Sequence, residues 1–269
     1  MAVMVAFLAV AITGFQPQPQ VTGGKATLGG NTRIGASLAQ WTPASATTSG
    51  GQSTTMWFKA DSIGTCSTTA VSSWADSSGN GHTATQGTGG NQPVCHASQI
   101  NSLPAVYFTS SSNQYLIIAS PPTLSNATIF VAFQSYYSDE TILGGPTTPT
   151  GGLQYYLSSQ KQCMQGSYDG SIGCGTGTGL DQNTWFQTAA TFTGGTSYAF
   201  YRYSGSATTS DGGSTTATTI SGPTAQLGCD HGTGSCITAY IAEIVVYSSV
   251  LSATDITQVQ GYLHTRYGL

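Results

Sequence analysis

From residue 56 onward, hydrophobic residues fall in short runs that are separated by turn residues. The runs are rich in Ile, Val, Tyr, Phe and Thr, and the stretches between them are rich in Gly, Asn, Ser and Pro. Such alternation is typical of β-strands joined by tight turns. The strands expected on this basis span residues 56–59, 105–108, 115–118, 128–133, 153–157, 185–192, 197–203 and 240–247. Many short strands of this kind predict two antiparallel sheets packed as a sandwich or jelly roll.

The end of the chain follows a different pattern, with apolar positions three or four residues apart. Ile256, Val259 and Leu263 fall on one face of a helix. Ser252 suits the N-cap, and Asp255 stands three residues later, where it completes a capping box. The sequence therefore predicts an all-β fold that is closed by one short C-terminal helix.

Residues 1–15 carry no charged side chain, and the first cation is Lys25. A secretory signal would combine such an apolar stretch with a basic beginning. As a helix the stretch would be about 22 Å long, short of the roughly 30 Å hydrocarbon core of a membrane, and no ordinary transmembrane span is expected. We expect residues 1–21 to be an apolar segment, helix or strand, through which copies of the chain assemble. An extra strand on the chain's own domain is the alternative.

Composition divides the chain into three parts. The apolar segment 1–21 is followed by residues 22–54, which are rich in Gly, Ser and Thr with only Trp41 as an aromatic anchor. That composition is typical of a linker or of an arm lying on a surface. Residues 55–269 contain all the predicted strands and the helix, and are expected to form one domain.

Charge is scarce: of 269 residues, six are Lys or Arg and ten are Asp or Glu, for a net charge of −4. So few cations cannot neutralise a nucleic-acid backbone, and nucleic-acid binding is not expected. The six cysteines form three neighbouring couples that bracket loop-like stretches. Local pairing is therefore expected, with a zinc site at the last couple as the less favoured alternative. Three such disulfides predict an oxidising, extracellular location. The couples are Cys66 with Cys95, Cys163 with Cys174, and Cys229 with Cys236.

Several segments resemble a known family. They are residues 56–61 (MWFKAD), 74–82 (WADSSGNGH), 103–108 (LPAVYF) and the ending that runs from 241–247 (IAEIVVY) to 267–269. In this order they resemble the concanavalin A-like, laminin-G-like domains of bacterial and phage surface proteins. The resemblance covers residues 55–269 and implies a jelly-roll sandwich of two curved antiparallel sheets, used for glycan binding, adhesion or structural display. It does not imply an enzyme, because one fold hosts many activities.

The turn at residues 74–82 has a structural interpretation. Asp76 is expected to cap backbone amides there, while the glycines take positive φ. Trp57 and Trp74 are expected to be core residues that span the space between the sheets. A weak calcium site at Asp76 is the alternative, although calcium takes about six to eight oxygen ligands and the nearest acid in sequence is Asp61. No other cofactor is expected.

Carboxylates suited to catalysis are not apparent. Glycoside cleavage needs two of them facing one groove. Asp139 and Glu140 are adjacent and would point to opposite faces of a strand, and Glu243 has no acid two or four residues away. We therefore expect no enzymatic activity and no catalytic residue.

Residues that could hold a sugar occur in several places, because the chain has fourteen tyrosines to offer ring faces and many amides and hydroxyls. The loop between Cys163 and Cys174 is the best-placed recognition loop, with a plain stapled hairpin as its alternative. The glycan-binding candidates are Tyr136, Tyr155, Gln165, Tyr168, Asp169 and Tyr203.

The sequence thus predicts a non-catalytic subunit that is displayed on an extracellular assembly, either a virion or a cell-surface filament. Residues 1–21 would join the copies, and the jelly roll would face outward for adhesion or glycan binding. A secreted, monomeric carbohydrate-binding module is the first alternative, and a polysaccharide-cleaving glycosidase is a more distant one.

Overall fold

A computed structural model describes residues 41–43, 51–137, 139–145, 152–166, 172–177, 179–203, 207–214, 220, 222–230 and 235–269. Residues 41–269 make up one compact unit. The predicted assembly segment, residues 1–21, lies outside the described residues, as does the linker 22–54 apart from 41–43 and 51–54.

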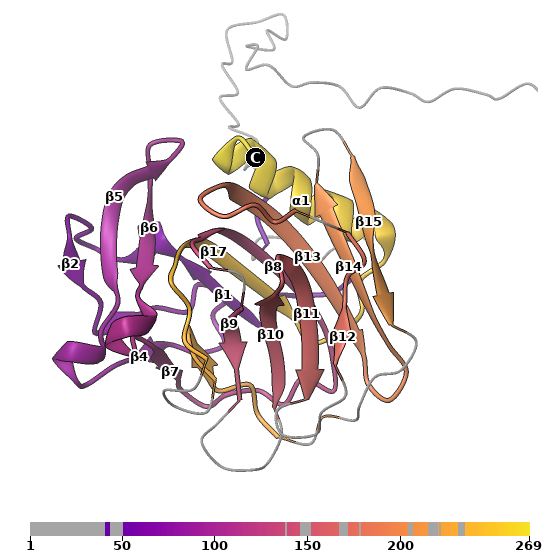
Figure 1. The fold of residues 1–269 in the computed structure, drawn as a ribbon, viewed down its shortest axis with the longest axis horizontal. Coiled ribbons are helices and arrows are strands. Elements are labelled where there is room, and N and C mark those ends of the chain that lie inside the picture. The colour runs from indigo at the N-terminus through magenta and orange to yellow at the C-terminus, as the bar shows by residue number, and fades with distance from the viewer. Residues whose placement is uncertain are drawn as a thin grey trace, which may run out of the picture. The chain divides into compact units, whose positions relative to one another are not determined.

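In the described residues, the strands form two antiparallel sheets (Figure 1). We call the larger one sheet A. Strand β1 (Met56–Lys59) pairs with its central strand β17. The rest of sheet A follows the order β15 (Thr208–Ser214), β14 (Ser197–Tyr203), β13 (Trp185–Thr193), β8 (Asn126–Ser135), β17 (Ala239–Tyr247), β6 (Leu103–Phe108), β5 (Val94–Ile100) and β2 (Thr69–Ala70).

The smaller one, sheet B, contains the shorter strands of the sandwich. Its order is β12 (Gly173–Cys174), β11 (Lys161–Gly166), β10 (Leu153–Ser158), β9 (Glu140–Gly144), β16 (Gln226–Leu227), β7 (Leu116–Ile118), β4 (Ala84–Thr85) and β3 (Ser73–Trp74). The antiparallel two-sheet sandwich predicted from the sequence is therefore confirmed. All eight predicted strands are present, within a few residues of their expected bounds.

The C-terminal helix forms as the sequence predicts. Helix α1 spans Ala253–Tyr267, and the Ser252 hydroxyl accepts a hydrogen bond from the Asp255 amide at 3.2 Å. Gly268 ends the helix in the left-handed conformation, at φ 73°. Three short 3₁₀ helices, η1 (Ala60–Ser62), η2 (Gly89–Asn91) and η3 (Ser110–Ser112), lie in the connections. In the part of the chain that the structure describes, no helix is both long and apolar enough to span a membrane.

Two apolar clusters stabilise the fold. The first lies between the sheets and includes Trp74, Phe108 and Tyr155. The second lies between sheet A and α1 and includes Trp57 and Leu263. Burying one such large side chain contributes about 1.5–3 kcal/mol. Trp74 occupies the place predicted for it, whereas Trp57 points out of the sandwich and packs under the helix, because its register partner Val245 faces the same way.

The three disulfides join the couples predicted from the sequence. The bonds are Cys66–Cys95, Cys163–Cys174 and Cys229–Cys236. Local pairing is confirmed, and Cys229 and Cys236 are not available as thiolate ligands for zinc. Three disulfides are consistent with an extracellular or secreted protein.

The turn at residues 74–82 is capped as expected. One carboxylate oxygen of Asp76 accepts hydrogen bonds from the amides of Trp57 at 3.0 Å and Ser78 at 2.9 Å, and the other accepts one from the amide of His82 at 3.0 Å. Gly79 and Gly81 have φ of 89° and 83°, which glycine adopts without steric cost.

Candidate functional site: a polar pocket on the outer face of sheet B

The two sheets differ in what covers their outer faces. Helix α1 packs on the outer face of sheet A, where it contacts β13, β8 and β15 (Figure 1). It is the single α-helix of the described residues, so in that part of the chain the outer face of sheet B carries no helix.

A pocket with a volume of about 280 Å³ opens over β9, β10 and β11 of sheet B. Sites for drug-sized ligands usually enclose about 300–1,000 Å³, so this pocket fits a small ligand or one unit of a longer one. Its lining is mainly polar. It consists of Asp139, Glu140, Thr141, Gln154, Tyr156, Leu157, Ser158, Gln165, Ile172 and Ser235.

Alternation along β10 places the polar side chains in this pocket. Leu153 and Tyr155 belong to the core between the sheets, so Gln154 and Tyr156 point to the opposite, outer face. Gln165 of β11 is the register partner of Gln154 and therefore projects from the same face.

Hydrogen bonds link the amides of the pocket into a row. Gln165 donates to the side-chain oxygen of Gln154, and Gln154 donates to the hydroxyl of Thr141 at 2.9 Å. The backbone of Thr141 in turn donates to the carbonyl of Ser235 at 3.2 Å. An amide both donates and accepts hydrogen bonds, so such a row suits a ligand that carries hydroxyl groups.

Asp139 brings a carboxylate to the pocket. It accepts hydrogen bonds from the hydroxyl of Ser158 at 2.8 Å and from the amide of Ser159 at 3.1 Å. Burial, together with the nearby charge of Asp139, raises the pKa of Tyr156 to about 12. The tyrosine hydroxyl therefore stays neutral at physiological pH and can both donate and accept a hydrogen bond.

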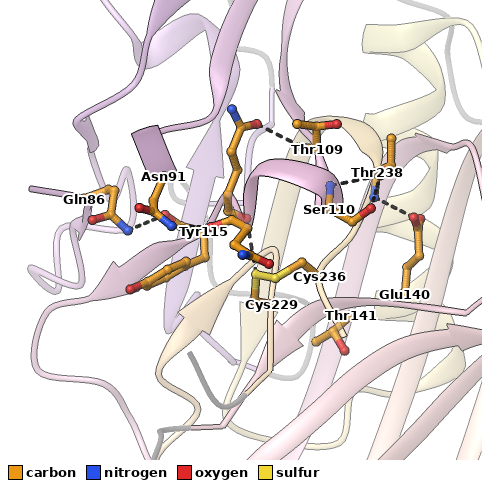
Figure 2. The surroundings of a disulfide bond; sticks show 12 residues. Gln86, Asn91, Thr109, Ser110, Tyr115, Glu140, Thr141, Cys229, Cys236 and Thr238 are labelled. Atoms are coloured by element: carbon orange, nitrogen blue, oxygen red, sulfur yellow. Dashed lines mark hydrogen bonds between the residues drawn. A yellow bond between two sulfur atoms is a disulfide. The ribbon is translucent and has the colours of Figure 1, made fainter. Parts of the chain in front are cut away.

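Glu140 lies deeper, at the junction of the two sheets. One carboxylate oxygen accepts a hydrogen bond from the Thr238 amide at 2.6 Å, and the other accepts one from the Ser135 hydroxyl at 3.0 Å. Figure 2 shows this side chain beside the Cys229–Cys236 disulfide, with the bond from Thr238 dashed. The side chain is only 3 % exposed, and burial raises its pKa to about 7 in spite of these hydrogen bonds.

Two of the disulfides hold the walls of the pocket. Cys163 pairs in register with Cys174, next to Gln165 on β11. On the other side, the Cys229–Cys236 bond fixes the segment that carries Ser235. A Cβ atom at Gly144 would collide with the carbonyl oxygen of Cys229, so glycine is needed where β9 meets this segment.

The sequence-predicted candidates do not form one site. Gln165 lines the pocket, and Tyr168 and Asp169 lie outside the described residues. Tyr155 is fully buried and donates to the side chain of Gln162 at 2.9 Å, so its ring has no face for a sugar. Tyr203 is in β14 and Tyr136 directly follows β8, both of sheet A, and neither lines the pocket.

Tyr203 and Tyr136 each have aromatic neighbours. Tyr203 contacts His264 of α1, with ring centroids 5.4 Å apart, and Tyr136 contacts Tyr107 and Tyr240. Gln154, Tyr156 and Ser158 line the pocket but are not among the candidates predicted from the sequence. The signal that could have indicated them is the alternation 153–158, whose polar phase faces away from Leu153 and Leu157.

The second glutamate, Glu243, belongs to the covered face of sheet A. It is fully buried and accepts hydrogen bonds from Trp57 Nε1 at 2.5 Å and from the Tyr267 hydroxyl at 2.7 Å. Arg266 forms an ion pair with it at 3.1 Å and also binds Asp61. Burial raises the pKa of Glu243, against the opposing effects of Tyr267, Trp57 and Arg266.

Metal ligands are not gathered in the described residues, where no group of three or more His, Cys, Asp or Glu side chains could hold an ion. Both carboxylate oxygens of Asp76 accept hydrogen bonds from protein donors, which is the role of a turn cap. Calcium at Asp76 remains a prediction from the sequence.

Comparison with known proteins shows the fold and no closer relationship. No family model matches the chain, and no curated protein matches it. Among solved structures, a GH54 α-L-arabinofuranosidase soaked with a cyclic sulfate inhibitor aligns with a TM-score of 0.55 at 11 % identity, over 74 % of this chain and 51 % of that one. The botulinum neurotoxin type G receptor-binding domain aligns with a TM-score of 0.54 at 12 % identity, over 78 % and 51 %.

A third solved structure is matched over nearly its whole length. It is domain 4 of a GH43 extracellular arabinanase from Geobacillus stearothermophilus, in complex with arabinotriose. The TM-score is 0.54 at 16 % identity, over 77 % of this chain and 97 % of that one. The chain thus spans about half the length of the arabinofuranosidase and toxin chains, and it has the fold of all-β sandwich domains found in glycosidases and toxins.

Proposed function

We propose that this protein is an extracellular carbohydrate-binding domain that holds one unit of a neutral glycan in the pocket on the outer face of sheet B. The observation that carries the proposal is the pocket lining: the linked amides of Gln154 and Gln165, the hydroxyl of Tyr156 and the carboxylate of Asp139. These groups match the hydroxyls of a sugar, and Ile172, which is 56 % exposed, offers an apolar contact. The anionic groups disfavour an acidic sugar.

Two further observations support the proposal. The disulfides on either side of the pocket hold its walls before a ligand arrives, which lowers the entropy cost of binding. The sandwich fold is shared with the arabinanase domain that was solved with arabinotriose. As part of the proposal, the domain is a member of the laminin-G-like family and its jelly roll is displayed for binding, both of which are consistent with the same fold.

The test is titration calorimetry with neutral arabino-, xylo-, cello- and malto-oligosaccharides. We expect Gln165→Ala to weaken binding about tenfold, because loss of a hydrogen bond to a neutral ligand costs about 0.5–1.5 kcal/mol. Gln99→Ala, on β5 of the opposite sheet, is the matched control and should leave affinity unchanged. Absence of binding to every sugar, or equal affinity of both variants, would refute the proposal.

Glycoside hydrolysis is a second candidate function, because Asp139 and Glu140 both line the pocket and the pKa of Glu140 is raised to about 7. We favour binding without catalysis. Both carboxylate oxygens of Glu140 already accept hydrogen bonds, from the Thr238 amide and the Ser135 hydroxyl, so both are engaged within the protein itself. Release of reducing sugar by the wild-type protein but not by Glu140→Gln would establish hydrolysis instead.

Display on a virion or filament through residues 1–21 is a separate part of the proposal and is supported by the uncharged apolar sequence of residues 1–15. Removal of residues 1–20 should leave a folded monomer, while the full chain forms larger assemblies in light scattering. Identical assembly of both forms would contradict it.

A further inference from the structure

Five aromatic side chains meet on sheet A, and none of them lines the pocket. Tyr240 stands at the centre of this group, with ring centroids 4.8 Å from Tyr107, 5.5 Å from His96, 6.2 Å from Tyr136 and 6.3 Å from Trp185. We call these five residues the aromatic cluster. All five are partly exposed to solvent.

The cluster belongs to the outer face of sheet A. Ala239 and Ile241 of β17 point into the core between the sheets, so Tyr240 points outward. Tyr107 is its register partner on β6, and both Tyr240 and Trp185 pair with Gln134 of β8. Tyr240 and Trp185 also pack against the margin of the apolar cluster beneath α1, which leaves the rest of the group beside the covered area.

The chemistry of this surface is aromatic and hydroxyl-rich. Burial raises the pKa of Tyr136 and of Tyr240, and the neighbouring phenols add to both shifts, so these hydroxyls stay neutral. The carboxamide of Gln134, on the strand between Tyr240 and Trp185, donates through its nitrogen to the Asn183 carbonyl at 2.6 Å and adds an acceptor oxygen. Ring faces receive the C–H faces of sugars, and neutral hydroxyls and amides pair with sugar hydroxyls.

We propose that the aromatic cluster is a second glycan-binding surface, which takes a neutral polysaccharide chain. The inference rests on the proposed function, which already makes a neutral glycan the ligand of the pocket. The pocket opens on the outer face of sheet B and the cluster on the outer face of sheet A, so the two surfaces face away from each other across the sandwich. One molecule therefore binds two chains at once, gains avidity for a polymer and cross-links it.

The test compares Tyr136→Ala/Trp185→Ala with Tyr137→Ala, a control tyrosine that is 59 % exposed and stands next to the cluster. The probes are soluble arabinan and xylan in affinity gel electrophoresis, and beads coated with the same polymers in a turbidity assay. We expect the double variant to bind the polymers about tenfold more weakly and to stop clumping the beads, while Tyr137→Ala behaves as wild type. Affinity of the double variant for a short oligosaccharide in the pocket should be unchanged.

Other outcomes separate this inference from the proposed function. If the double variant still clumps the beads, the inference is wrong and the pocket function stands. If it instead loses self-association in light scattering with polymer binding intact, the cluster is a protein interface and the inference is wrong. If Gln165→Ala has no effect while the double variant loses polymer binding, the cluster is confirmed and the pocket is not. Trp185→Ala alone serves the same comparison if the double variant does not fold.

Discussion

Two acidic residues on the two sheets, Glu243 and Asp139, have different surroundings. On sheet A, Glu243 is fully buried beneath α1. Its carboxylate accepts hydrogen bonds from Trp57 and Tyr267 and forms an ion pair with Arg266. On sheet B, Asp139 borders a pocket whose walls are amides and hydroxyls. The sequence alone does not distinguish the role of the Glu243 carboxylate from that of the Asp139 carboxylate.

The hydrogen-bond partners of a carboxylate indicate whether it stabilises the fold or can contact a ligand. A buried carboxylate with every oxygen occupied by its own chain stabilises one arrangement of elements, here β1, β17 and α1. The hydrogen-bonded side chains of Gln165, Gln154 and Thr141 can still bind a ligand at the pocket, since amides and hydroxyls can exchange hydrogen-bond partners. The part of sheet A beneath α1 therefore holds the molecule together, whereas the pocket on sheet B presents donors and acceptors to a ligand.

Glu243→Ala breaks the covered face and should have the largest effect. It removes the acceptor of the buried Trp57 N–H and Tyr267 hydroxyl and one of the two carboxylates that pair with Arg266, and loss of one partner of a buried pair costs about 3–5 kcal/mol. Urea denaturation measures the change, and Glu243→Gln, which keeps shape and an acceptor, should cost less. A loss below about 1 kcal/mol would show that the network contributes little.

Removing a disulfide beside the pocket and one that does not border it should separate effects on stability from effects on glycan binding. Replacing Cys66 and Cys95 with Ser opens the longer loop and should cost about 3–4 kcal/mol, with glycan affinity retained. Replacing Cys229 and Cys236 should cost about 2–3 kcal/mol but also weaken binding, because that bond fixes Ser235 beside the pocket. Thermal unfolding and calorimetry read the two effects. Equal affinity of both variants would contradict the role given to the second disulfide.

Stability should depend on pH through Glu140. Its pKa is about 7 in the folded protein, against 4.5 for an ordinary glutamate, so the folded state binds the proton more tightly. The contribution of Glu140 to the free energy of unfolding is therefore fully present below pH 4.5 and is lost as the pH rises from 4.5 to about 7, by about 1–3 kcal/mol. Glu140→Gln should flatten this part of the profile. Parallel profiles of the variant and the wild type would contradict the assignment.

The smallest effect on stability is expected at the rim of the pocket. Ile172→Ser changes an exposed side chain and should alter the free energy of unfolding by less than about 0.5 kcal/mol. It should nevertheless weaken glycan binding several-fold, because the proposed site places this pocket-lining side chain against the sugar. Val250→Ser, at another exposed apolar residue, is the control. Unchanged affinity of Ile172→Ser would place the ligand elsewhere.

The sequence predicted the parts of the fold that depend on local patterns. Short β-rich runs indicated the longer strands, Ser252 and Asp255 indicated the helix start, and the loop-like spacing indicated the disulfides. Strands with few β-branched residues, such as β11 (KQCMQG), or with small residues, such as β15 (TTSDGGS), gave no such signal. Those strands pair because longer neighbours hold them in register.

The pocket could not be predicted because its residues come from five separate segments, represented by Asp139, Gln154, Gln165, Ile172 and Ser235. Only tertiary packing brings them together. Tyr155 and Tyr156 illustrate the remaining ambiguity: alternation requires one ring to face inward, but it does not say which one. The structure buries Tyr155 and turns Tyr156 to the pocket, whereas the residue predicted from the sequence is Tyr155.

The most direct test of the central claim is an NMR titration of the ¹⁵N-labelled protein with neutral oligosaccharides. The side-chain amide groups of Gln154 and Gln165 give their own signals, and assignment by single Gln→Ala variants identifies them. The account predicts that these signals shift in a saturable way, with the indole signal of Trp57 beneath α1 unchanged. Shifts confined to the covered face, or no shift with any sugar at millimolar concentration, would contradict a glycan site on the outer face of sheet B.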